Sequence, residues 1–214
     1  MIPASGQDLK KPIAARPVMR LPYADPSALT APEDRAVVSR VEARRAPRPL
    51  QALDLTLLHS PAVADGWNSF LGAIREKTSL SADVRETAIC RVAVCNQAWY
   101  EWMHHAPLAR EGGVSEEGMK LLGEPELDAS KGGDGLTERQ WAVVAYTDAM
   151  TRGVAVEQEV FDGLKKHFSD KEVVEITATV RAFLRPFQRV VTGLEIPNTL
   201  LTLLQHAGCR VQLC

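Results

Sequence analysis

The sequence predicts an all-α protein, and three observations lead to this prediction. Apolar residues recur three and four positions apart in most segments after residue 33, which is the period of a helix packed on one face. Ser, Thr, Pro and Gly stand between these segments, where helices would begin or end. No segment shows the period of two, bounded by turn residues, that identifies a β-strand. We therefore expect helices packed on helices.

The N-terminal stretch, residues 1–32, is expected to be an extended arm. It contains six prolines, and each proline removes a backbone donor and obstructs the preceding helical turn. Such an arm is either disordered or laid across a partner subunit. The remaining residues, 33–214, are expected to form one helical domain.

The first helix is expected to begin at Thr30, a capping residue, with Pro32 and two acidic residues following in the first turn. A second apolar segment opens at Leu53. Ser60, which precedes a proline, marks another helix start. The apolar face of this helix should be buried, and it comprises Val63, Trp67, Phe70, Leu71 and Ile74.

The longest apolar segment runs from Asp83 to Arg110 and is expected to start at a Ser81 cap. The polar pair Asn96-Gln97 lies in its middle and is predicted to break it into two helices. Later helices are expected over 115–122, 137–152, 156–168 and 170–191, the last kinked near Pro186, with a Gly-rich loop over 123–135 and a final apolar turn after Ile196.

The overall composition excludes some classes of function. A net charge of −2 does not provide the basic surface that nucleic-acid binding needs, so no nucleic-acid partner is expected. No apolar run reaches the roughly 18–20 residues that cross a bilayer, so no membrane partner is expected. The first residues lack the apolar core of a secretory signal. A cytoplasmic location is the expectation.

The four cysteines do not form a metal or redox motif. Cys90 and Cys95 lie five apart within a helical pattern, and Cys209 and Cys214 are separated by the same interval near the C-terminus. Neither interval is that of CxxC or of a zinc site. All four are expected to be reduced thiols without a role in catalysis.

Three chemically active side chains occur within 20 positions: Glu86, Glu101 and His105. On one unbroken helix, Glu86 and His105 would be roughly 28 Å apart. A chain reversal at Asn96-Gln97 would instead bring Glu86 back beside the other two. Glu101 and His105, at positions i and i+4, share one helical face and can form a hydrogen bond.

Two carboxylates and an imidazole in one dry site can move a proton. A carboxylate favours the charged imidazole, and burial raises the pKa of a carboxyl group, so both can exchange protons near neutral pH. His105 is the predicted general acid and base, Glu101 the residue that orients it, and Glu86 the holder of a water or a second proton. The alternative is a buried ion pair that only joins two helices.

The same region resembles the carboxymuconolactone decarboxylase family, which includes alkyl hydroperoxide reductase D. The resemblance is carried by Arg85-Glu86, Arg91-Val-Ala93, the run Ala98-Trp-Tyr-Glu-Trp-Met-His-His105, Ala109 and Gly113-Val-Ser115. It extends in weaker form from Leu53 to Ile196. The resemblance implies the helical fold of that superfamily and a homo-oligomer, either a trimer or a hexamer.

The resemblance also separates two branches of the family. Counted from Glu86, the two redox cysteines of the peroxidase branch would fall on Ala98 and Glu101, so both thiols are missing. The decarboxylase branch has Glu followed four residues later by His, which Glu101 and His105 match. The resemblance therefore implies a decarboxylase-like protein without a redox pair, and neither a cofactor nor a metal is expected.

Further residues are candidates for binding a substrate. Trp99, Tyr100 and Trp67 could form an aromatic wall for a flat substrate, although packing in the core or at an interface is the alternative. Arg189 precedes the Leu-Glu-Ile of the resemblance and could hold a carboxylate, although an arginine row is often a solvated face. His104 points about 100° away from His105 and is expected at the surface.

The expected function is that of a cofactor-independent lyase or isomerase acting on a cyclic or aromatic acid. A tailoring step on a polyketide-like compound in secondary metabolism fits the decarboxylase-like branch. The alternatives are an oxidoreductase or oxygenase without a catalytic thiol, and a helical oligomer that binds a ligand without catalysis.

Overall fold

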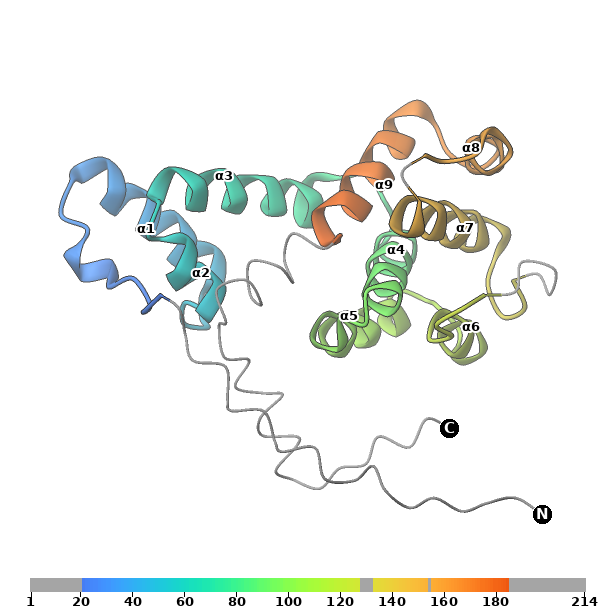
Figure 1. The fold of residues 1–214 in the computed structure, drawn as a ribbon, viewed down its shortest axis with the longest axis horizontal. Coiled ribbons are helices and arrows are strands. Elements are labelled where there is room, and N and C mark those ends of the chain that lie inside the picture. The colour runs from blue at the N-terminus through green and yellow to red at the C-terminus, as the bar shows by residue number, and fades with distance from the viewer. Residues whose placement is uncertain (1–20, 128–132, 154, 185–214) are drawn as a thin grey trace, which may run out of the picture.

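The computed structural model describes residues 21–127, 133–153 and 155–184, and every regular element within these ranges is helical (Figure 1). The prediction of an all-α fold is therefore confirmed. Most of the predicted arm, residues 1–20, lies outside the described part. Its described end contains one 3-10 turn, η1 (Pro26–Ala28). The separation of an arm from a domain at residue 32 stays a prediction.

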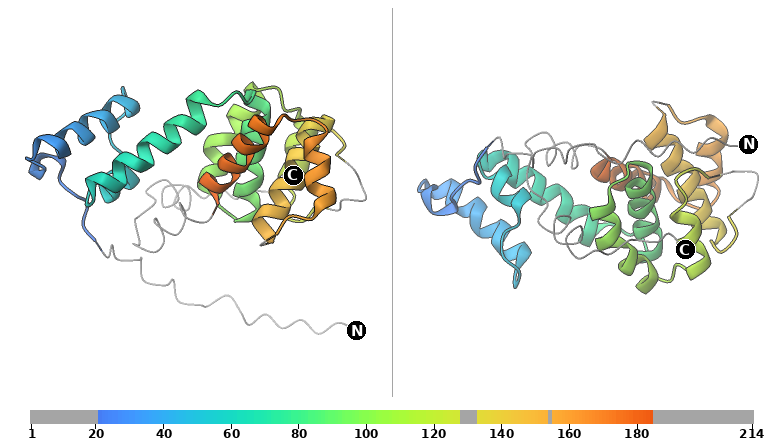
Figure 2. Two further views of the ribbon diagram at one scale, coloured as in Figure 1. Left: turned by 90° about the horizontal axis from the view of Figure 1, so that it is seen from above. Right: turned by 60° about the horizontal axis from the view of Figure 1, so that its bottom comes forward.

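Three helices form one end of the molecule, where α1 (Pro32–Arg45) and α2 (Ala52–Leu57) lie beside the start of α3 (Pro61–Gly72) (Figure 2). Their shared core consists of Val37, Val38, Val41, Leu58 and Ala64. The predicted cap at Thr30 is wrong by one position. The cap residue is Ala31, which makes no side-chain hydrogen bond, and the proline at the first helical position begins the helix.

Helix α3 runs from this end toward the rest of the molecule and continues as a π-helical turn, η2 (Ala73–Lys77) (Figure 1). Leu71 and Ile74 are buried, as predicted. Val63 and Phe70, however, are 55% and 44% exposed, so the prediction of one fully buried face is wrong. Helix α3 contacts α1 through Ala64 and the main core through its last turns, and this leaves much of its predicted face uncovered.

The rest of the described chain packs around one central helix, α4 (Ala82–Cys95), which contacts α5, α6, α7 and α9. Ten of its fourteen residues are buried. The surrounding helices are α5 (Trp99–Glu111), α6 (Glu116–Leu122), α7 (Glu138–Arg152), α8 (Gln158–Lys165) and α9 (Asp170–Phe183). Since α4 also buries Glu86 and Arg91, the bundle must supply partners for two charges.

Local capping explains where three of these helices start. Ser115, Thr137 and Ser169 each accept a hydrogen bond from a backbone N–H in the first turn of the helix that follows. Thr137 and Ser169 complete a capping box with a Gln or a Glu three residues later. The described part of the last predicted helix, 170–191, ends at Phe183. The predicted kink near Pro186 and the turn after Ile196 lie outside the described residues.

Candidate functional site

The chain reverses direction between α4 and α5. Helix α4 ends at Cys95, Asn96 caps it, and Gln97 takes a left-handed conformation with φ +55°. The N–H of Ala98 then donates to the carbonyl oxygen of Ala93 at 2.7 Å, and α5 begins at Trp99. The predicted break at Asn96-Gln97 is therefore confirmed, and α4 and α5 form an antiparallel pair.

The reversal places Glu86 of α4 beside His105 of α5. The Nδ1 atom of His105 donates a hydrogen bond to Oε2 of Glu86 at 2.7 Å, and both residues are buried. The second carboxylate oxygen of Glu86, Oε1, accepts from Nε of Arg85 at 3.1 Å. Both oxygens of Glu86 therefore have a donor, and one edge of the imidazole ring is fixed.

Glu101 lies at the other edge of the same ring. Its Oε2 atom is 3.7 Å from Nε2 of His105, which is longer than a hydrogen bond. Its Oε1 atom is buried and makes no hydrogen bond in the part of the chain that the structure describes. The predicted hydrogen bond between Glu101 and His105 is therefore absent among these contacts, and Glu86 is the residue that orients the ring.

The two carboxyl groups have opposite electrostatic environments. Burial raises the pKa of Glu101, and the charges of His105 and Arg75 offset this only in part. Burial also acts to raise the pKa of Glu86, but the hydrogen bond and charge of His105, together with Arg85, outweigh it and lower that pKa. Glu86 is thus ionised at neutral pH, and Glu101 retains its proton to a higher pH than Glu86 does.

This arrangement determines which nitrogen of His105 can react. An ionised Glu86 can only accept, so the proton of the neutral imidazole resides on Nδ1. Nε2 then carries the lone pair and faces Glu101. The edge-on ring of Phe183, with centroids 5.2 Å apart and planes at 78°, packs against the imidazole. His105 and Glu101 can therefore pass a proton between them or to a bound molecule.

The residues predicted to bind substrate are only partly described. Trp67 is half-buried and packs against the main hydrophobic core, so its place in an aromatic wall stays a prediction. Trp99 and Tyr100 form the first turn of α5, but their side chains are outside the described part, as is Arg189. His104 is exposed, as predicted, and burial and nearby cations lower its pKa.

Arg91 is a structural residue. It is completely buried and binds both carboxylate oxygens of Asp148, the second through Nη2 at 2.7 Å. Its Nη1 atom donates to the carbonyl oxygens of Leu122 and Glu124 at 3.1 and 2.5 Å. All three nitrogens of the guanidinium donate and the side chain is completely buried, so Arg91 is not available to anchor a substrate.

Sequence reasoning missed Arg75, which lies in η2 near both carboxylates of the site. Its guanidinium carbon is 5.8 Å from the centroid of Phe183, the ring that also contacts His105. Nothing in the local sequence pattern marks this arginine, because the apolar face of α3 was expected to end at Ile74. Its position depends on the π-helical turn and on the packing of α9.

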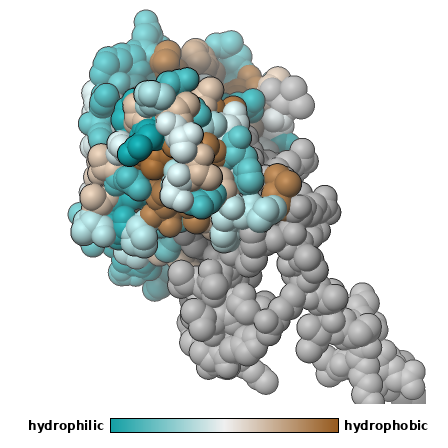
Figure 3. All heavy atoms as spheres, turned by 90° about the vertical axis from the view of Figure 1, so that its left-hand side faces the viewer, coloured by the Kyte–Doolittle hydropathy of each residue, from teal (hydrophilic) through white to brown (hydrophobic). Residues whose placement is uncertain are grey.

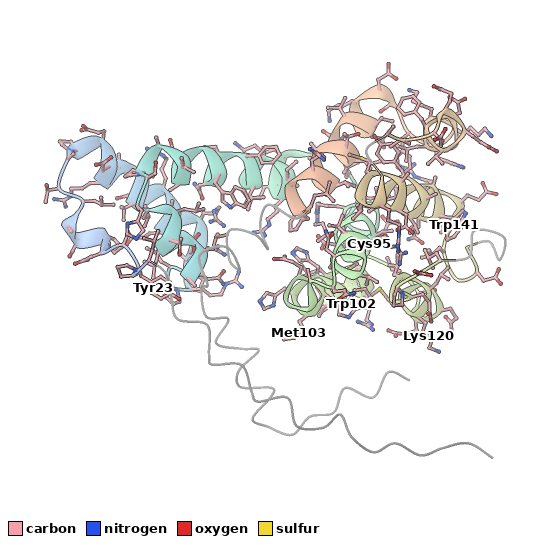
Figure 4. All side chains as sticks on the ribbon, viewed as in Figure 1. Tyr23, Cys95, Trp102, Met103, Lys120 and Trp141 are labelled. Carbon is pink, nitrogen blue, oxygen red and sulfur yellow. The ribbon has the colours of Figure 1, made fainter. Side chains whose placement is uncertain are left out.

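The two described cysteines are poor nucleophiles. Burial raises the pKa of both thiols, and that of Cys95 reaches about 11. Cys95 donates to Oδ1 of Asp148 at 3.1 Å, on the side of α4 toward α7 (Figure 4). Trp102, by contrast, packs between α5 and α6, and Met103 points outward (Figure 4). Within the described ranges, no three His, Cys, Asp or Glu side chains are grouped as metal ligands.

A separate hollow lies at the opposite end of the molecule, between η1 and α1. Its volume is about 520 Å³, and its lining includes Asp25, Arg35 and Glu42. Figure 3 shows this end face-on, with hydrophobic and hydrophilic side chains intermixed. Its lining contains no histidine or cysteine. None of the described helices has the length and apolar character to cross a membrane.

Comparison with known proteins bears on one segment of the sequence and on the fold. Residues 61–123, which include Glu86, Glu101 and His105, match the carboxymuconolactone decarboxylase family model. A peroxidase-related protein with an alkylhydroperoxidase AhpD core, from Ralstonia eutropha JMP134, has a similar fold. Its TM-score is 0.63 at 20% identity, covering 86% of this chain and 93% of that one. The family match covers 63 of the 214 residues, and the solved structure shows that the fold is AhpD-like.

A second structural relative is the debrominase Bmp8. Its apo structure has a TM-score of 0.57 at 15% identity, covering 82% of this chain and 89% of that one. A cysteine-to-alanine variant of Bmp8 in complex with 2,3,4-tribromopyrrole has a TM-score of 0.58 at 16% identity, covering 86% and 95%. No curated protein matches the chain in sequence. These structures establish the fold of the chain.

Proposed function

We propose that the protein is a cofactor-independent lyase or isomerase acting on a cyclic or aromatic small-molecule acid. The observation that carries this proposal is the buried hydrogen bond from His105 to Glu86, beside the carboxyl group of Glu101. A buried ion pair that served stability alone would not need a second carboxyl with a raised pKa at the reactive edge of the ring.

Each of the three residues has a separate task. Glu86 holds the imidazole through Nδ1. Nε2 of His105 removes a proton from a substrate carbon or returns one to it. Glu101, which retains its proton to a higher pH, supplies or stores the second proton.

Both versions of the reaction balance without an added reagent. In a decarboxylation, the bond between the ring carbon and the carboxylate breaks, CO₂ leaves, and the electron pair moves onto a conjugated carbonyl oxygen. The carbon then takes a proton from His105 or Glu101. In an isomerisation, the proton removed from one carbon is returned to another. The polarised carbonyl must be part of the substrate in either case.

The structural relatives support a small aromatic substrate. Bmp8, which shares this fold, is a debrominase, and one of its structures holds 2,3,4-tribromopyrrole. A site in the same fold that holds a molecule such as 2,3,4-tribromopyrrole is compatible with a flat acid beside His105. The thiols of this chain do not favour peroxidase chemistry, since the pKa values of Cys90 and Cys95 are both raised.

The test is proton transfer to carbon. We expect the protein, incubated with a panel of aromatic and lactone acids in D₂O, to release CO₂ or to incorporate deuterium at a ring carbon, as measured by NMR. His105→Gln should lower the rate about 10²–10⁴-fold, the usual contribution of a general acid or base. His104→Gln, one residue away and exposed, is the matched control and should be close to the wild type.

Unchanged turnover in a folded His105→Gln variant would refute this mechanism. A reaction that stops without O₂ but proceeds in its presence would instead indicate the oxidoreductase or oxygenase. If the panel shows neither reaction and binding survives in the variants, the protein is a ligand-binding oligomer without catalysis.

A further inference from the structure

The π-helical turn η2 brings Arg75 to the side of the candidate site. Turns of this kind are rare and frequently occur where a helix presents a functional residue. The guanidinium carbon of Arg75 lies 5.8 Å from the centroid of Phe183, and the same ring is 5.2 Å from the imidazole of His105. One aromatic ring therefore contacts both the arginine and the reactive histidine.

Arg75 differs from the other partly or fully buried arginines of the described chain. Each of the others binds a carboxylate: Arg44 and Arg45 bind Asp54, Arg85 binds Glu86, and Arg91 binds Asp148. Arg75 makes no ion pair in the described ranges, and its buried Nε atom has no hydrogen-bond acceptor there. Leaving a buried donor without an acceptor costs free energy, so we expect an oxygen atom of a ligand to accept a hydrogen bond from this N–H group.

Among the described residues, the acidic neighbours of Arg75 leave its guanidinium without an ion pair. Glu101, Glu86 and Asp54 are its acidic neighbours, but none of them is within ion-pair distance among the described contacts. Glu86 already binds His105 and Arg85. Burial, and next the charge of Arg45, lower the pKa of Arg75, yet a guanidinium remains charged at neutral pH. Its partly exposed fork therefore has unused donors for a planar oxyanion.

We propose that Arg75 binds a carboxylate of the substrate and thereby positions the ring beside Nε2 of His105. This inference rests on the proposed function, because it specifies how the acid is held. The carboxylate on Arg75 is a binding group and not the one that leaves. A guanidinium stabilises an ionised carboxylate in the ground state and would raise the barrier to losing it as CO₂. Arg189, predicted for this role from the sequence, lies outside the described residues.

The test uses benzoate as the carboxylate probe and benzamide as its neutral analogue of the same shape. Isothermal titration calorimetry of the full chain should show benzoate binding at least about tenfold more tightly than benzamide. Arg75→Gln should lower benzoate affinity about tenfold or more and leave benzamide affinity unchanged. Arg75→Lys, which keeps the charge but loses the fork, should fall in between. Arg40→Gln, an exposed arginine on α1, is the control of equal charge and should bind like the wild type.

Outcomes for the subsite and for the catalytic proposal can be distinguished. Benzoate affinity that is equal in the wild type and the folded Arg75→Gln variant, or no preference of the wild type for benzoate over benzamide, overturns the subsite. If Arg75→Gln does not fold, Arg75→Lys decides, and an unchanged affinity there overturns it. Arg75-dependent benzoate binding without proton transfer to any acid supports the subsite and removes the proposed function. If turnover depends on His105 but the KM of the Arg75→Gln variant equals that of the wild type, the proposed function stands and the subsite is refuted.

Discussion

Glu101 is buried, and one of its carboxylate oxygens has no hydrogen-bond donor within the described chain. Burial alone penalises the charged form, and at this residue the penalty exceeds the attraction of His105 and Arg75. Glu86 lies on the neighbouring helix, four positions before Cys90. It accepts hydrogen bonds from two donors, and its pKa is lowered. The difference between two chemically identical side chains comes entirely from their partners.

Glu101→Gln should therefore stabilise the protein at neutral pH. The pKa of Glu101 is raised above 4.5, so between pH 4.5 and the folded pKa the native state binds more protons than the unfolded state. Wild-type stability consequently falls as the pH rises through this window, and the variant escapes this loss. Thermal melts from pH 3.5 to pH 8 should show a higher Tm for the variant at pH 7 and equal values at the acidic end.

Glu86→Gln should have the opposite effect on stability at neutral pH. The pKa of Glu86 is lowered, so its ionised form stabilises the native state above pH 4.5, and this contribution is lost as the pH falls through the folded pKa. The variant should melt below the wild type at pH 7 and approach it in acid. Parallel pH profiles for both variants would contradict the distinction between the two carboxyls.

At the scale of the element, the α4–α5 pair depends on two backbone positions. Gln97 closes one end with φ +55°, a region that non-glycine residues seldom occupy. Gly112 closes the other end, where an added Cβ would lie 2.9 Å from the backbone nitrogen of Asp83. These positions bring the helices close enough for Glu86 to bind His105.

Gln97→Gly should raise the free energy of unfolding by about 0.5–1 kcal/mol, because glycine adopts the left-handed conformation without a steric penalty. Gln97→Val should lower it by about 1–2 kcal/mol, since a β-branched side chain is the least tolerant of this conformation. Urea denaturation measures both. A valine variant as stable as the glycine variant would show that Gln97 does not hold this conformation in solution.

Gly112→Ala should lower stability by about 1–3 kcal/mol, because the start of α4 must move away from the end of α5. Gly66→Ala is the matched control. It lies within α3 and its added Cβ would meet no atom within 4 Å, so helix propensity should raise stability by about 0.5–1 kcal/mol. The same urea titrations apply, and a neutral result at Gly112 would contradict the close contact.

Across the whole molecule, α4 is the helix on which α5, α6, α7 and α9 pack, and its buried charges join separate parts of the chain. Arg91 connects α4 to Asp148 of α7 and to two carbonyl oxygens at the C-terminal end of α6, those of Leu122 and Glu124. Glu86 connects α4 to His105 of α5. The first pairing lies in the core of the bundle, and the second is the one proposed above to take part in proton transfer.

Arg91→Met should lower the free energy of unfolding by about 3–5 kcal/mol, because Asp148 and two carbonyl groups lose their main donor. Adding Asp148→Leu should recover part of this loss, since the uncompensated carboxylate is then removed. Guanidinium denaturation of the single and double variants measures both effects. A double variant less stable than Arg91→Met alone would show that Asp148 has other, more important partners.

The homo-oligomer implied by the family resemblance stays a prediction. The exposed Val63 and Phe70 lie seven positions apart on α3, so they share one face of that helix. If this face is covered by a second copy, Phe70→Glu should shift the mass measured by light scattering toward the monomer, while Arg40→Gln should not. A monomeric wild type would remove both the trimer and the hexamer.

Local sequence determined most of the helices. The spacing of apolar residues, the capping residues and the polar pair at Asn96-Gln97 act within a few positions of one another, and the elements they predicted formed with shifts of a few residues at their ends. The grouping of Glu86, Glu101 and His105 followed from the same local break, because a reversal at a known position determines which residues of two helices meet.

Tertiary packing decided what the pattern alone left open. It made Glu86 rather than Glu101 the hydrogen-bond partner of His105, placed Arg75 beside Phe183, and left Val63 and Phe70 exposed. Each outcome depends on contacts between helices far apart in the chain, and periodicity within one helix contains no information about them. The helices of this protein are determined by its sequence, whereas the charge and pairing of the candidate site are determined by which helices surround it.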